Sequence, residues 1–124
     1  MDAENKILEK LDLDFYSDEC DITDEGLSKV ITSLVANTSF RELTLSTNGQ
    51  VGTMTSQALN TLLCSSTSIT TLLWWDQRSG AYDTSIVDQV LQGIKQNRSL
   101  RNLDFYSLEG AFGDSFLRRL FDAV

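Results

Sequence analysis

Three aspartates, Asp12, Asp14 and Asp104, stand at alternating positions of short apolar segments that are far apart in the sequence. If those segments form neighbouring strands of one sheet, the carboxylates are about 5 Å apart per strand spacing, which suits general acid–base chemistry. The chain has no histidine, so it lacks the commonest general base and the usual partner of a nucleophile. Because no other residues supply a nucleophile with its base, an acid–base enzyme is the weakest interpretation, and we expect a protein that is not an enzyme.

Metal and cofactor chemistry finds equally little support in the residue pattern. Cys20 and Cys64 form no CxxC pair, which favours free thiols in a reducing compartment. The acidic stretch around residues 12–25 lacks the alternating ligands, central glycine and terminal glutamate of a calcium-binding loop. The glycines match neither of the phosphate-binding patterns GxGxxG and GxxxxGK[ST]. We therefore expect no cofactor and no metal site.

The apolar segments that hold the aspartates belong to an internal repeat. The pattern apolar-x-x-apolar-x-apolar ends in the period-two alternation of a strand, and each copy precedes a stretch with helical spacing of apolar residues. The helical apolar residues are Leu27, Val30, Ile31 and Leu34; Leu59, Leu62 and Leu63; Val87, Val90, Leu91 and Ile94; and Leu117, Leu120, Phe121 and Val124. The strand pattern occurs at Leu8, Leu11 and Leu13; Phe40, Leu43 and Leu45; Ile69, Leu72 and Trp74; and Leu100, Leu103 and Phe105.

A constant spacing fixes how the repeats align. An apolar anchor precedes each helix, at Ile22, Val51, Tyr82 and Phe112. From the anchor to the third strand position of the next repeat the count is 23 each time (22 to 45, 51 to 74 and 82 to 105), whereas the preceding loop varies in length. Neighbouring repeats must keep register to stack, while surface loops tolerate insertions. The anchors are followed by the expected helix caps, namely Thr23-Asp24, Thr53, Thr84 and Asp114.

Segments such as Asp21-Ile22-Thr23-Asp24-Glu25-Gly26-Leu27 and Asn37-Thr38-Ser39-Phe40-Arg41-Glu42-Leu43-Thr44-Leu45 closely resemble the ribonuclease-inhibitor-like class of leucine-rich repeats, over nearly the whole chain. The resemblance implies an α/β fold: a right-handed leucine-rich-repeat solenoid, a horseshoe section with a parallel β-sheet on the concave face and α-helices on the convex face. It predicts one domain over 1–124, with repeats at about 8–39, 40–68, 69–99 and 100–124. The asparagine or cysteine that this class places after the strand is matched only by Asn48.

Alternation then separates the two adjacent tryptophans. Trp74 falls in the buried series, whereas Trp75 falls in the series that faces away from the helices. Trp75, Leu73 and Tyr106 are expected to form an apolar and aromatic patch on the concave face, a composition enriched at protein interfaces. An alternative leaves Trp75 covered by a loop or a neighbouring side chain. The predicted partner-binding residues are Trp75, Leu73, Tyr106, Asp12, Asp14 and Asp104.

Composition limits the class of partner. The formal charge of -8 disfavours binding to nucleic acid and to anionic membrane surfaces. The sequence contains no apolar stretch of bilayer-spanning length and does not begin like a signal peptide, so we expect a soluble, cytoplasmic protein. Uncapped terminal repeats indicate either a fragment of a longer array or a chain that self-associates.

The leading interpretation is therefore a protein–protein interaction module that binds another protein on its concave face and loops. The alternative is a structural section or cap of a larger repeat receptor or cytoskeletal regulator.

Overall fold

The computed structural model describes residues 10–15, 21–36, 39–76 and 82–107, and in these strands and helices alternate strictly. In chain order they are β1 (Lys10–Asp14), α1 (Asp24–Ser33), β2 (Glu42–Thr47), α2 (Thr53–Ser65), β3 (Thr71–Asp76), α3 (Thr84–Gln96) and β4 (Asn102–Ser107). Among these helices none is both long and apolar enough to cross a bilayer.

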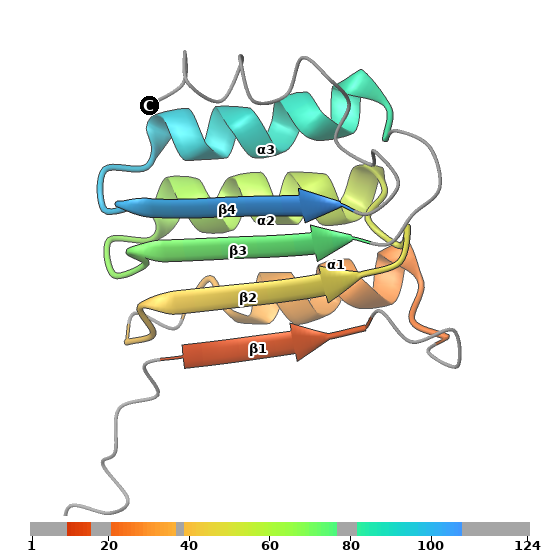
Figure 1. The fold of residues 1–124 in the computed structure, drawn as a ribbon, viewed down its shortest axis with the longest axis horizontal. Helices are drawn as coiled ribbons and strands as arrows, with labels where there is room; N and C mark the ends of the chain where they lie inside the picture. Colours follow the sequence, from red (N-terminus) through yellow and green to blue (C-terminus); the bar gives the residue numbers. More distant parts are fainter. Residues whose placement is uncertain (1–9, 16–20, 37–38, 77–81, 108–124) are drawn as a thin grey trace, which may run out of the picture.

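The four strands form one parallel sheet in the order β1-β2-β3-β4, and the three helices lie together on one face of it (Figure 1). α1 packs against α2, and α2 against α3. The strand register places Leu13 beside Leu45, Leu45 beside Trp74, and Trp74 beside Phe105. These are the third strand positions of the repeat, so the alignment that the 23-residue spacing predicted is confirmed.

The core lies between the sheet and the helices. The predicted inward strand residues Leu43, Leu45, Leu72 and Trp74 are at most 2% exposed. The anchors Val51 and Tyr82 are buried as well, whereas Ile22, in the first repeat, is half-buried. The buried helix residues of the predicted stripes are Leu27, Ile31, Leu59, Leu62, Leu63, Val87, Val90, Leu91 and Ile94. The stripe at 117–124 and the anchor Phe112 lie outside the described residues.

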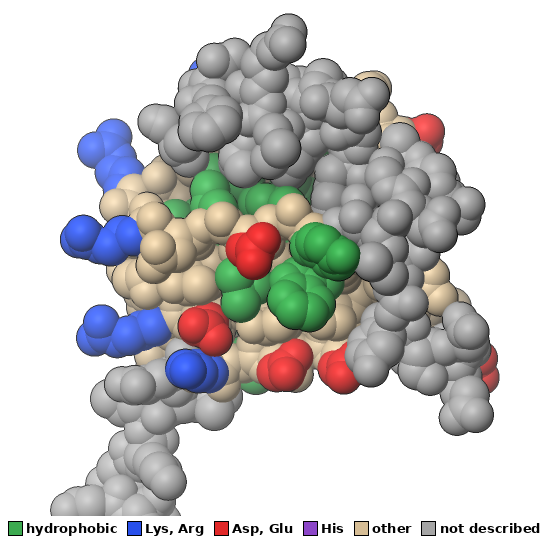
Figure 2. Space-filling view, viewed as in Figure 1, with side chains coloured by type: hydrophobic (Ala, Val, Ile, Leu, Met, Phe, Trp, Pro, Cys, Tyr) green, Lys and Arg blue, Asp and Glu red, His purple; other side chains and the backbone are tan. Residues whose placement is uncertain are grey.

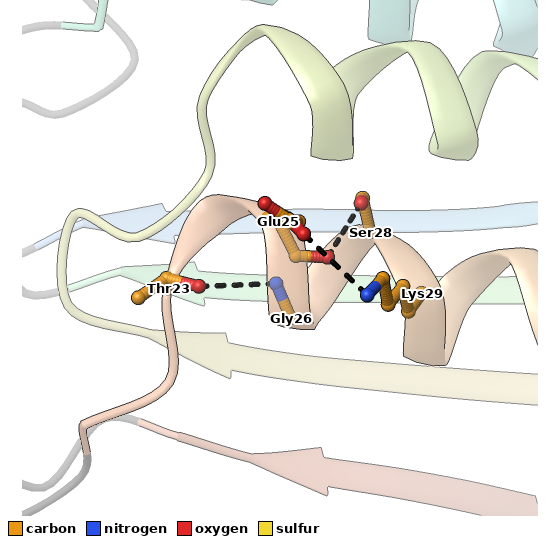
Figure 3. A network of polar contacts seen from close by, with 5 residues as sticks. All are labelled: Thr23, Glu25, Gly26, Ser28 and Lys29. Carbon is orange, nitrogen blue, oxygen red and sulfur yellow. Dashed lines mark hydrogen bonds and ion pairs between the residues drawn. The ribbon is translucent and has the colours of Figure 1, made fainter.

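The helices begin in three different ways, and only one of them matches the predicted caps. The Thr23 hydroxyl accepts a hydrogen bond from the Gly26 amide at 3.1 Å and caps α1 (Figure 3). The same turn contains a bond from the Ser28 hydroxyl to the Glu25 carbonyl and the ion pair of Lys29 with Glu25.

The prediction that Thr53 and Thr84 cap their helices was wrong. Each is the first helical residue, because the chain enters the helix one position earlier, and the N-cap residues are Gly52 and Asp83. Neither of these makes a side-chain capping bond. The fourth predicted cap, Asp114, lies outside the described residues.

The α2 N-terminus is capped instead by the preceding repeat. The Asp24 carboxylate accepts hydrogen bonds from the amides of Gly52 (2.8 Å), Met54 (3.0 Å) and Thr55 (2.9 Å). A β-carbon on Gly52 would lie 2.6 Å from an Asp24 carboxylate oxygen, so this approach requires glycine. Burial alone would raise the pKa of Asp24, but the hydrogen bonds from Thr55, Gly52 and Met54 together hold it below its usual value of 3.8.

We expect Asp24→Ala to lower the free energy of unfolding by about 1–2 kcal/mol, the usual loss for a helix cap. The matched control is Asp83→Ala, because Asp83 occupies the N-cap of α3 without a side-chain bond and its loss should cost a few tenths of a kcal/mol at most. Since the folded pKa of Asp24 is lowered, its stabilisation is present above pH 3.8 and lost as the pH falls through the folded value. Urea denaturation at neutral and acidic pH measures both effects; equal losses in the two variants would contradict the assignment of this cap.

The turn from α3 into β4 is also held across repeats. The Asn97 side chain donates to the carbonyls of Leu63 (2.8 Å) and Ser66 (3.2 Å), at the end of α2. Its carbonyl oxygen accepts from the amides of Ser99 and Leu100, both at 2.7 Å. The Asn97-Arg98-Ser99 segment thus serves as a structural turn that ties one repeat to the next.

Candidate protein-binding face

The face of the sheet opposite the helices presents three columns of side chains. The strand register defines the columns as Lys10, Glu42, Thr71 and Asn102; Asp12, Thr44, Leu73 and Asp104; and Asp14, Ser46, Trp75 and Tyr106. We call this surface the open face. Its side chains are exposed or half-buried, whereas the residues with which they alternate are buried in β2 and β3 and half-buried in β1 and β4.

The largest apolar feature of the open face is an aromatic pair at the ends of β3 and β4. Trp75 is 50% exposed and Tyr106 49%, and their ring centroids are 5.8 Å apart with the planes tilted by 58°. Leu73, half-buried, precedes Trp75 on the same face. Half of the Trp75 surface thus remains open to solvent, which leaves room for a partner.

The structure brings together four of the six predicted binding residues and separates the other two. Asp104 is opposite Leu73 and shares β4 with Tyr106, so it borders the aromatic pair. Asp12 and Asp14 are on β1, and the β2 residues Thr44 and Ser46 lie between them and β3.

The carboxylates are not arranged as the catalytic interpretation expected. β1 and β4 are the two outer strands of the sheet, with β2 and β3 between them. Three strand spacings place Asp12 roughly 14 Å from Asp104, rather than on a neighbouring strand. The expectation of adjacent carboxylates was wrong because it assumed that strands bearing aspartate are neighbours, whereas the strands follow chain order.

Charge is unevenly distributed on this side of the molecule. Figure 2 shows hydrophobic side chains bordered by acidic ones, with lysine and arginine gathered at the margin where the strands begin, on the left of the view. Arg41 and Arg101 directly precede β2 and β4 and are exposed. Backbone bonds from Thr70 to the Arg41 carbonyl (2.7 Å) and from Arg101 to the Thr70 carbonyl (2.8 Å) align these residues along that margin.

A buried polar cluster, which the sequence did not lead us to expect, lies on the helix side of the sheet at the ends of β2 and β3. Asp76 is 1% exposed, and one of its carboxylate oxygens accepts hydrogen bonds from the hydroxyls of Thr47 and Tyr82 and from the Gly49 amide. The Trp74 indole donates to Thr47 at 2.9 Å. The alternation that buries Trp74 also places Asp76 inward, so a carboxylate at a core position was the available signal.

The cluster fixes the turn that leaves β2. Gly49 has a φ of 82°, a left-handed conformation that favours glycine, and it directs its amide at the Asp76 carboxylate. Gln50 reaches from the same turn to the Phe15 carbonyl at 2.7 Å, which ties it to the preceding repeat. Burial raises the pKa of Tyr82 well above its usual value of 10.0, and the hydrogen bond and charge of Asp76 act in the same direction.

No family model matches this chain, and the comparison with curated proteins found no match. Among solved structures, one described as leiomodin-1 actin-binding site 2 aligns with a TM-score of 0.63 and 19% identity, covering 90% of this chain and 62% of that one. The tropomodulin C-terminal domain from Caenorhabditis elegans aligns with a TM-score of 0.48 and 11% identity, covering 94% of this chain and 81% of that one. The chain therefore spans 62% of the leiomodin-1 structure and shares its fold. With the repeated strand and helix, this likeness supports a fold of the leucine-rich-repeat type.

Proposed function

We propose that this chain is a protein-binding section of a leucine-rich-repeat protein and that it holds its partner on the open face. The observation that supports this most is the exposed pair of Trp75 and Tyr106 beside Leu73. Tryptophan and tyrosine are the residues most enriched among those that dominate binding energy at protein interfaces. Asp104 borders this patch, and Asp12 and Asp14 contribute at the β1 edge.

In the same proposal the four repeats at about 8–39, 40–68, 69–99 and 100–124 stack as a right-handed solenoid of the ribonuclease-inhibitor-like class. The open face is then its concave side. The module works in the cytoplasm, binds without a cofactor and is not an enzyme. Self-association through the terminal repeats is the competing use of the chain, and analytical ultracentrifugation would reveal it as a mass that grows with concentration.

Trp75→Ala should weaken partner binding by about thirtyfold or more, the level that defines a dominant interface residue. The matched control is Met54→Ala, because Met54 is a large apolar side chain, 48% exposed, on α2 rather than on the open face. Affinity capture from a native lysate compares the proteins retained by the unaltered chain and by each variant. A partner retained by the unaltered chain and by Met54→Ala but lost by Trp75→Ala is the expected result. If Trp75→Ala retains the same proteins, the open face is not the binding site.

A second candidate is a section of a cytoskeletal regulator, and it is supported by the structural likeness to an actin-binding site of leiomodin-1. Cosedimentation of this chain with purified actin filaments tests it, alongside a binding assay with monomeric actin. If Trp75→Ala loses actin binding and Met54→Ala keeps it, both proposals hold together, with actin as the partner bound on the open face. If neither form of actin binds, the partner belongs to another class of protein.

A further inference from the structure

We infer that the partner presents a positively charged segment, with an arginine or lysine side chain seated against Trp75 and Tyr106; this inference rests on the function proposed above. It follows from the charges of the open face. Among its twelve side chains, Lys10 is the one cation, and the four carboxylates are Asp12, Asp14, Glu42 and Asp104. An excess of carboxylates favours encounter with a basic partner.

The aromatic pair gives the cation a specific place. The faces of tryptophan and tyrosine rings attract cations within about 6 Å, and guanidinium also stacks on them. The two rings are tilted by 58° at a centroid distance of 5.8 Å, and both are half-exposed, so ring surface remains available. An uncharged apolar partner would use the same rings but would leave the surrounding carboxylates without a counter-charge.

Asp104 is the carboxylate best placed to assist. It precedes Tyr106 by two residues on the same face of β4, roughly 7 Å along the strand, and it is opposite Leu73. Asp104 is exposed, and Asp14 approaches from the other side, about two strand spacings, or roughly 10 Å, from Trp75. A cation on the rings would therefore lie between carboxylates on both sides.

The basic margin limits where such a segment can lie. Arg41 and Arg101 are exposed at the beginning of the strands and would repel a cation there. The favourable position is toward the strand ends, where the aromatic pair is found. Arg101 and Asp104 are three residues apart around the start of β4, so they form a matched pair of opposite charge for mutation.

The test uses a capped hexa-arginine peptide, with capped hexa-glutamate and an uncharged leucine–serine hexapeptide for comparison. The chain has two tryptophans, so ¹⁵N-indole labelling gives two resonances, and Trp75→Phe assigns them. Hexa-arginine should shift the Trp75 resonance saturably and leave that of Trp74 nearly unchanged, because Trp74 is buried and donates to Thr47. Asp104→Asn should weaken the affinity roughly two- to fivefold at low salt, and Arg101→Gln should preserve or strengthen it.

The outcomes separate this inference from the proposed function. If hexa-glutamate or the uncharged peptide shifts the Trp75 resonance more than hexa-arginine does, the partner is not basic, although the open face still binds. If none of the three peptides shifts the Trp75 resonance, the proposed cation-binding position on Trp75 and Tyr106 is also rejected. If hexa-arginine, added to uniformly ¹⁵N-labelled protein, shifts backbone amide resonances of the helices but leaves the Trp75 indole resonance unchanged, both the inference and the assignment of the open face fail.

Discussion

Trp74→Ala should lower the free energy of unfolding by about 3–5 kcal/mol, whereas Trp75→Ala should lower it by about 1 kcal/mol or less. Trp74 is 1% exposed, contacts the rings of Tyr82 and Phe105, and donates its indole N–H to Thr47. Its removal leaves a large cavity and an unpaired hydroxyl acceptor. Trp75 has half of its surface in solvent, so most of its transfer free energy is already absent from the folded state.

Urea denaturation, followed by circular dichroism, measures both variants under the same conditions. Each tryptophan is the control for the other, because the two are neighbours in β3 and differ in the face they occupy. A larger loss for Trp75→Ala than for Trp74→Ala would overturn the assignment of faces, and with it the binding surface. The same pair of variants ensures that any lost partner binding in Trp75→Ala reflects the surface rather than unfolding.

The sequence predicted the strand register because this fold repeats its geometry. Leu45, Trp74 and Phe105 occupy one column since every repeat must return to the sheet after the same helical path. The open-face columns followed from the same alternation, and so did the contrast between Trp74 and Trp75. Local periodicity sufficed wherever each repeat contacts only its neighbours.

Contacts between repeats were harder to foresee. Asp24 was expected to cap its own helix, but its carboxylate caps α2. A side chain can cap its own helix or the next one, depending on how closely the two repeats pack side by side. The sequence of one repeat does not determine that spacing. The expectation of neighbouring carboxylates failed for a similar reason, because the distance between Asp12 and Asp104 depends on strand order rather than on strand pattern.

The repeat pattern did not predict the buried cluster around Asp76. That pattern is defined by apolar residues, whereas Asp76 is a polar residue at an inward position. Thr47 and Asp76 continue the inward series of β2 and β3, where the earlier inward positions of the same strands have leucine or tryptophan. Together with Tyr82, they form a network that requires all its members, since a buried carboxylate without donors is costly. The cluster joins two strands, the turn at Gly49 and the anchor of the third repeat.

Asp76→Ala should therefore lower the free energy of unfolding by about 3 kcal/mol, because it removes the buried carboxylate that accepts hydrogen bonds from the Thr47 hydroxyl, the Tyr82 hydroxyl and the Gly49 amide. Tyr82→Phe removes the Tyr82 hydroxyl from the network but leaves its ring in place, and it should cost about 1–1.5 kcal/mol. The loss in the double variant should be smaller than the sum of the losses in the two single variants, because Asp76→Ala already removes the carboxylate that accepts from the Tyr82 hydroxyl. Asp104→Ala is the control, since its exposed carboxylate should cost about 0.5 kcal/mol at most.

Alkaline pH provides a second readout of the same cluster. The folded pKa of Tyr82 is raised, so its contribution to stability is fully present below the unfolded value of 10.0 and is lost as the pH rises above it. Between the unfolded and folded values this loss approaches about 1.4 kcal/mol per pH unit. Urea denaturation above pH 10 should show a steeper decline for the unaltered chain than for Tyr82→Phe. Parallel declines would mean that the folded pKa of Tyr82 is not raised. Additive losses in the double variant would mean that Tyr82 and Asp76 are not coupled.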